Sequence, residues 1–165
     1  MKLEQGLEWL KDDAKQYPVD DPTGYYTTVD IIRIFPEIKM ETIQDWIKRG
    51  FFKPKFIIKI GLGDKKFFVR SQLCMIGLFK KLVDLGIHRE YAKTWIRAFH
   101  NKRVDLFKNH DLEPDFVILE IEQKEIKALT VLNGEIEIKQ NVKGRDLVII
   151  NFHRVINQID SYSKG

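Results

Sequence analysis

Apolar residues recur every three or four positions over most of the first hundred residues, and this spacing predicts a series of short amphipathic helices. The first of these helices has its apolar side at Leu3, Leu7, Leu10 and Ala14. The segment that follows, 18–24, is rich in proline and aspartate and predicts a loop. We therefore treat residues 1–24 as a helix with a linker, separate from the rest of the chain.

The next predicted helix extends from Tyr25 to Phe35. Thr27 or Thr28 can cap its first turn, where Asp30 would complement the helix dipole. Its apolar stripe is formed by Ile31, Ile34 and Phe35. Proline at position 36 ends it, because proline cannot continue the helical hydrogen bonds.

A second helix is predicted after a tight turn, from about Lys39 to Arg49, with Gly50 as its C-terminal stop. The side expected to be buried carries Met40, Ile43 and Ile47. The spacing of Trp46 from the last two residues also places part of its ring against the core. The opposite, polar side of this helix carries Glu41, Gln44, Asp45 and Lys48.

A hairpin and two more helices follow. Residues 56–60 and 65–69 are β-branched, aromatic and basic, and they predict two strands joined by a turn at 61–64. The third helix of this region starts at Ser71 as its cap and ends at Gly86. The fourth continues to about residue 107, with an apolar side expected at Tyr91, Trp95, Ala98 and Phe99.

Beyond Pro114 the pattern changes to strands. They are predicted at 116–121, 128–132, 135–139 and 146–150, with a terminal helix over 153–161 whose inward side carries Val155, Ile156 and Ile159. Asn133-Gly134 predicts a hairpin turn, because both positions of that turn need positive φ. The fold class is therefore α+β. About 50 residues barely bury a core alone, so region 111–165 should pack on another copy, a partner or the helical region.

Charge adds a second pattern. Residues 26–108 hold 18 lysines and arginines against 8 acids, whereas both flanks are net acidic. Such a basic centre suits contact with a polyanion or forms a solvated lysine-rich face. A single cysteine, Cys74, excludes an internal disulfide and fits the cytoplasm. The N-terminus resembles no secretory signal, and no apolar run of about 18 residues predicts a membrane span.

The order of these elements resembles the winged helix-turn-helix of the MerR family and its excisionase-like relatives over residues 26–96. The matching pieces are Tyr26-Thr27, Thr42-Ile43-x-x-Trp46-Ile47-x-x-Gly50-Phe51-Phe52-Lys53-Pro54, Lys66-Phe67-Phe68, Leu73 and Leu82-x-x-Leu85-Gly86-Ile87.

This resemblance implies a DNA-binding domain over 25–110. Residues 111–165 show no such resemblance, and their small size and strand-rich pattern predict a C-terminal module for dimerisation or a protein partner. The resemblance further implies a transcriptional regulator that binds double-stranded DNA as a homodimer. The DNA-binding residues it implies are Tyr26, Thr27, Lys39, Glu41, Thr42, Gln44, Asp45, Lys48, Arg49, Lys65 and Lys66.

The chain departs from the family pattern on the recognition helix. Arginine is common in the family where Glu41 and Gln44 stand, an aromatic residue where Asp45 stands, and a small cap where Lys39 stands. Glutamine can still read adenine, and glutamate can accept from cytosine. Two alternatives therefore stay open: an excisionase-like accessory factor that bends DNA, and a protein-interaction module that keeps the fold without binding DNA.

Motifs for catalysis are missing from the sequence. The four histidines have no HExxH spacing, and there is no Gly-x-Ser-x-Gly elbow or phosphate loop. We therefore expect no enzyme activity, no metal and no cofactor.

Overall fold

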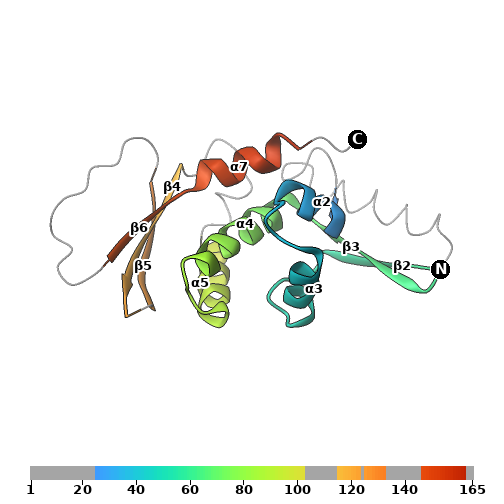
Figure 1. Cartoon of the computed structure of the whole chain (residues 1–165), viewed down its shortest axis with the longest axis horizontal. Coiled ribbons are helices and arrows are strands. Elements are labelled where there is room, and N and C mark those ends of the chain that lie inside the picture. The colour runs from blue at the N-terminus through green and yellow to red at the C-terminus, as the bar shows by residue number, and fades with distance from the viewer. Residues whose placement is uncertain (1–24, 103–114, 124, 133–145, 163–165) are drawn as a thin grey trace.

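The computed structural model describes residues 25–102, 115–123, 125–132 and 146–162. It confirms the α+β class: helices and two three-stranded antiparallel sheets alternate along the chain. The helices are α2 (Thr28–Ile34), α3 (Met40–Lys48), α4 (Arg70–Asp84), α5 (Arg89–Lys102) and α7 (Phe152–Asp160). The strands are β1 (Tyr26–Thr27), β2 (Phe56–Ile60), β3 (Gly63–Phe68), β4 (Phe116–Glu122), β5 (Glu125–Leu132) and β6 (Asp146–Asn151). Figure 1 shows the helices between the second sheet at one end and the β2–β3 hairpin at the other.

The first sheet has the order β1-β3-β2. Residues Tyr26 and Thr27, predicted as the start of a helix, instead form β1 opposite Phe68 and Phe67. The prediction was wrong at this end because the two residues gain strand partners from β3. The prediction that a threonine caps the helix was right, since the Thr27 side chain accepts a hydrogen bond from the backbone of Asp30.

Helix α4 lies at the centre of the fold, and five of its large apolar side chains are essentially inaccessible: Leu73, Ile76, Leu78, Phe79 and Leu82. It begins one residue before the predicted cap, so Ser71 lies inside the helix. The Gln72 side chain satisfies the free backbone N–H of Val69 at 3.0 Å and donates to the carbonyl of Lys53 at 2.7 Å. The backbone N–H of Gln72, which a serine cap would bind, donates instead to the carbonyl of Val69 at 2.9 Å.

The buried side of α5 differs from the prediction. Ala92, Ile96 and Phe99 are buried, whereas Tyr91 is 49% exposed and Ala98 is also exposed. The spacing of the buried residues, four and then three, follows the helical repeat one position later than expected. Trp95 lies at the margin and is partly buried.

The second sheet has the order β5-β4-β6, and all its pairs are antiparallel. Strand β5 starts at Glu125, three residues earlier than predicted, and pairs with β4 in a hairpin through Gln123, whose φ is 52°. The predicted strand 135–139 and the Asn133-Gly134 turn lie outside the described residues, as do the predicted helix at 3–14 and the end of the fourth helix.

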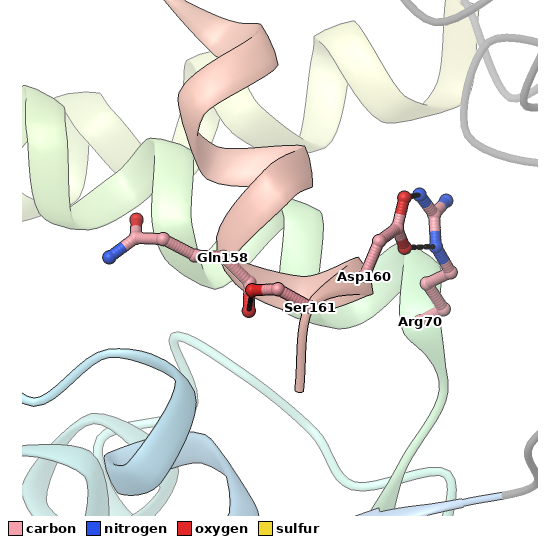
Figure 2. A network of polar contacts seen from close by, with 4 residues as sticks. All are labelled: Arg70, Gln158, Asp160 and Ser161. Carbon is pink, nitrogen blue, oxygen red and sulfur yellow. Dashed lines mark hydrogen bonds and ion pairs between the residues drawn. The ribbon is translucent and has the colours of Figure 1, made fainter. Parts of the chain in front are cut away.

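Helix α7 connects the second sheet to the helical region. Its buried residues Val155, Ile156 and Ile159 belong to the same apolar cluster as those of α4, which confirms their predicted inward side. At its end, the buried Arg70 of α4 donates through Nε and Nη2 to the two carboxylate oxygens of Asp160, both at 3.0 Å (Figure 2). Ser161 next to it donates to the carbonyl of Gln158 at 3.4 Å. Residues 152–162 therefore share a core with residues 25–102.

Candidate nucleic-acid interface

The orientation of α3 is fixed by its two buried residues, Ile43 and Trp46. Trp46 is only 2% exposed, and its ring meets the Phe79 ring of α4 edge-on, with centroids 4.8 Å apart. This burial confirms the structural position predicted for Trp46. Because these two residues face the core, the polar side of α3 points away from it, and Glu41, Gln44 and Lys48 are exposed.

A cleft of about 210 Å³ separates α3 from the β2–β3 hairpin. The residues that line it are Thr28, Gln44, Ile47, Lys48, Asp64 and Lys66. The cleft therefore places one side-chain amide between two lysine side chains from different elements. An amide can pair with a base edge, and an ammonium group suits a phosphate.

The register of the hairpin separates its two adjacent lysines. Lys66 pairs with Ile57 and Asp64 pairs with Lys59, so these residues share the face toward the cleft. Successive residues of a strand point to opposite faces, which places Lys65 on the other side. There its Nζ lies 5.7 Å from the centroid of the Phe67 ring. The two lysines therefore have different surroundings.

Asp45 of α3, next to Gln44 but outside the lining of the cleft, is paired with two arginines. Its Oδ1 accepts from Nε of Arg49 at 2.8 Å, and its Oδ2 lies 3.6 Å from Nη1 of Arg89 on α5. The hydrogen bond and the charge of Asp45 raise the pKa of Arg49. A second hollow, of about 350 Å³, adjoins this pair and is lined by Arg49, Phe51, Val83, Gly86, Ile87, His88, Arg89 and Glu90. The acidic side chain of Asp45 is therefore offset by basic groups.

The other residues implied by the resemblance are more scattered. Tyr26 is buried, and Thr27 is engaged in capping α2, so neither side chain is presented to a ligand. Lys39 and Glu41 are exposed at the start of α3, and Thr42 is half-buried there. Of the residues implied by the resemblance, the structure thus brings Gln44, Lys48 and Lys66 together in the cleft, and the others lie outside its lining.

Four residues of this surface were missed from the sequence: Thr28, Ile47, Asp64 and Arg89. Strand alternation alone could have grouped Asp64 with Lys66 and separated Lys65 from both. For Arg89 there was no such signal, because its contact with Asp45 joins α5 to α3 across the fold.

Within the described ranges, no group of three or more His, Cys, Asp or Glu side chains could hold a metal ion. In that same part of the chain, none of the helices has the length and apolar character needed to cross a membrane.

Comparison with known protein families finds no match to this chain, and comparison with curated proteins finds none either.

Proposed function

We propose that the protein is a DNA-binding transcriptional regulator, in which α2 and α3 act as a helix-turn-helix and the β2–β3 hairpin acts as a wing. The observation that carries this proposal is the cleft where Gln44 of α3 lies with Lys48 and with Lys66 of the hairpin. In the proposed complex, α3 enters the major groove with its exposed side toward the base edges.

Within this complex the three side chains have separate roles. Gln44 reads a base, and adenine is the base whose N6 and N7 atoms match an amide. Lys48 and Lys66 contact phosphates on the two sides of the groove, which fixes the position of α3 without carrying sequence information. The basic excess of residues 26–108 supplies the long-range attraction to the duplex.

The surroundings of the exposed side of α3 are less acidic than the residues of this helix suggest by themselves, and this favours contact with DNA. Of the two acids on that side, Asp45 is paired with Arg49 and Arg89. Two arginines beside one aspartate leave a local positive balance next to the exposed ridge of α3. Glu41 remains exposed at the start of the helix, where it could accept from cytosine N4.

The regulator is proposed to act as a homodimer on a palindromic or repeated site, because two copies of one recognition helix read two equivalent half-sites. The second sheet, opposite the hairpin in Figure 1, is the proposed self-association region. A protein partner at that sheet is the alternative to a second copy.

The test begins with selection of bound sequences from random duplexes, followed by titrations of variants at several salt concentrations. Lys66→Ala should weaken binding to all duplexes alike and reduce the slope of log affinity against log salt by about one unit. Gln44→Ala should keep that slope and lose discrimination at one base position, by roughly 1–3 kcal/mol. Lys65→Ala is the matched control, since this lysine lies on the other face of the same strand and should change the slope less.

The outcomes distinguish the classes of function. Sequence preference that depends on Gln44 supports a regulator. Bending without sequence preference points to a DNA-architecture accessory factor. If the wild-type chain binds no duplex even at low salt, the DNA-binding proposal fails and a protein-interaction module replaces it.

A further inference from the structure

The tip of the β2–β3 hairpin carries a leucine that is fully exposed. The register pairs Ile60 with Gly63, so the connection is the two-residue loop Gly61-Leu62. Gly61 has φ of 62°, whereas Leu62 has no positive φ, as in a type II′ turn. Leu62 has the largest exposure among the large apolar residues of the described part of the chain, at 111% of its reference area.

Turn chemistry gives no reason for a leucine at this position. After glycine in such a loop, the favoured residues are asparagine, aspartate and serine, whose polar groups remain in water. A leucine there leaves a whole apolar side chain hydrated in the free protein. Departures from local rules of this kind concentrate at functional sites.

The surroundings of Leu62 suit a nucleic acid. Lys59 is exposed just behind the tip on the face of the hairpin that carries Lys66, and Lys66 follows in the cleft with Gln44. One apolar side chain thus projects beyond a group of basic residues. A lipid surface fits less well, because membrane-bound elements insert a broad apolar face and this tip offers one side chain.

The length of the hairpin matches the spacing of DNA grooves. Lys66 follows Leu62 by four positions along β3, a distance of about 13 Å at roughly 3.3 Å per residue. Half a helical turn of DNA, which separates a major groove from the next minor groove on one face, is about 17 Å, so the phosphates between the two grooves lie about 8 Å from the minor groove, within the reach of the hairpin. With α3 in a major groove and Lys66 at the intervening phosphates, the leucine side chain reaches the adjacent minor groove.

We propose that Leu62 is a wedge that enters the minor groove beside the α3 site, partly unstacks a base step and bends the duplex. This inference rests on the proposed DNA binding and adds to it a distortion that the recognition helix alone does not produce. Apolar side chains inserted in this way kink DNA by about 20–90° toward the major groove. Flexible steps such as TA would be favoured at the insertion point.

The test uses the full chain and the selected sequence placed in a duplex of about 30 base pairs, labelled at both ends for energy transfer. Leu62→Thr should lose most of the bend while affinity falls by less than about tenfold, because the phosphate contacts remain. Leu62→Met, which keeps a long apolar side chain, should retain the bend. Leu85→Thr is the matched control: it removes an exposed leucine at the end of α4, away from the hairpin, and should bend as the wild type does.

Three results would overturn the wedge. A duplex that binds and stays straight, or one that is bent equally by wild type and Leu62→Thr, sinks the wedge alone and leaves DNA binding intact. Absence of any duplex binding removes both proposals together. Vesicles of mixed neutral and anionic lipid serve as a parallel probe: binding that is lost in Leu62→Thr, with DNA bending unchanged, assigns the tip to a membrane instead.

Discussion

Gly77, in the middle of α4, marks a close approach between α4 and α7. A Cβ atom at this position would lie 2.4 Å from Cγ1 of Val155 on α7 and 3.0 Å from the Phe35 ring. Both distances are shorter than van der Waals contact allows. The glycine is therefore required by packing, despite the helical stability that it forfeits.

Gly77→Ala is expected to lower the free energy of unfolding by about 1–2 kcal/mol. Overpacking costs about 1–3 kcal/mol, and the better helix propensity of alanine returns up to about 1 kcal/mol. Urea denaturation measures the change. The double variant with Val155→Ala should be more stable than the sum of the two single changes predicts. If Gly77→Ala stabilises the protein, α7 does not lie this close to α4.

Trp46→Ala is expected to cost about 3–5 kcal/mol, because a nearly inaccessible ring that packs on Phe79 leaves a large cavity. Thermal denaturation followed by circular dichroism provides the measurement. Gln44→Ala, on the exposed side of the same helix, is the control and should leave the melting temperature nearly unchanged. A melting temperature equal to that of the wild type would show that the ring of Trp46 is not part of the core.

The two residues differ in how far the sequence could predict them. Trp46 was predicted as structural because its partners Ile43 and Ile47 lie within one helical turn. Gly77 carried no signal, since the atoms that exclude a side chain come from Phe35 and Val155, far away in sequence. Periodicity reports which side of a helix is buried, and it contains no information on how closely another helix approaches.

At the scale of helices and strands, the residues in each turn decided whether a hairpin was predicted from the sequence. The β2–β3 hairpin was predicted because two glycines interrupt a β-branched run, and the structure has it there, although β3 starts at Gly63, two residues earlier than predicted. The β4–β5 hairpin was missed because its turn uses Gln123 in a left-handed conformation, which turn preferences do not favour. Residues Tyr26 and Thr27 were predicted as the start of a helix because the sequence does not show that β3 pairs with them as a strand.

Helix α2 and the end of α7 are joined through Asp30. Its Oδ2 accepts from the backbone N–H of Thr27 at 2.6 Å, and its Oδ1 accepts from the Tyr162 hydroxyl at 2.6 Å. The hydrogen bond to Asp30, followed by burial, raises the pKa of Tyr162. Thr27 also pairs with β3, so this carboxylate links the C-terminal helix to the strand that carries Lys66.

The raised pKa of Tyr162 predicts a loss of stability in alkaline solution. Folding favours the neutral phenol, so its contribution is complete below the ordinary pKa of about 10 and is lost as pH rises through the higher folded value. The stability difference between wild type and Tyr162→Phe should therefore be constant at neutral pH and shift against the wild type above about pH 10. Melting temperatures of both proteins across this range provide the check. Parallel curves would mean that the hydroxyl does not bond to Asp30 in solution.

For the whole molecule, the main point that the sequence left open is where the C-terminal region packs. Another copy, a partner and the helical region were all left open. The structure shows that α7 packs on α4 and closes with the Arg70–Asp160 pair, in which the Arg70 side chain is 3% exposed. This contact could not be predicted, because an amphipathic helix identifies its buried side without identifying the surface that covers it.

A chain shortened to end at Asp111 is expected to melt at a lower temperature than the full chain. The shortened chain loses Val155, Ile156 and Ile159 from the core, and Arg70 would be left without the Asp160 carboxylate. Circular dichroism and light scattering on both chains report stability and oligomeric state together. Self-association through the second sheet predicts a dimer for the full chain and a monomer for the shortened one. Equal melting temperatures would contradict a shared core, and equal oligomeric states would contradict the proposed dimer region.

The contact between α4 and α7 also has a consequence during translation. Val155 follows Gly77 by 78 positions, so at about 5–20 residues per second roughly 4–16 seconds pass between the synthesis of the two residues. Throughout this interval the nascent chain presents the groove at Gly77 without the helix that fills it. The ribosome-bound intermediate therefore exposes an apolar surface that the finished protein covers, and chaperones that bind such surfaces should associate with it until α7 has emerged.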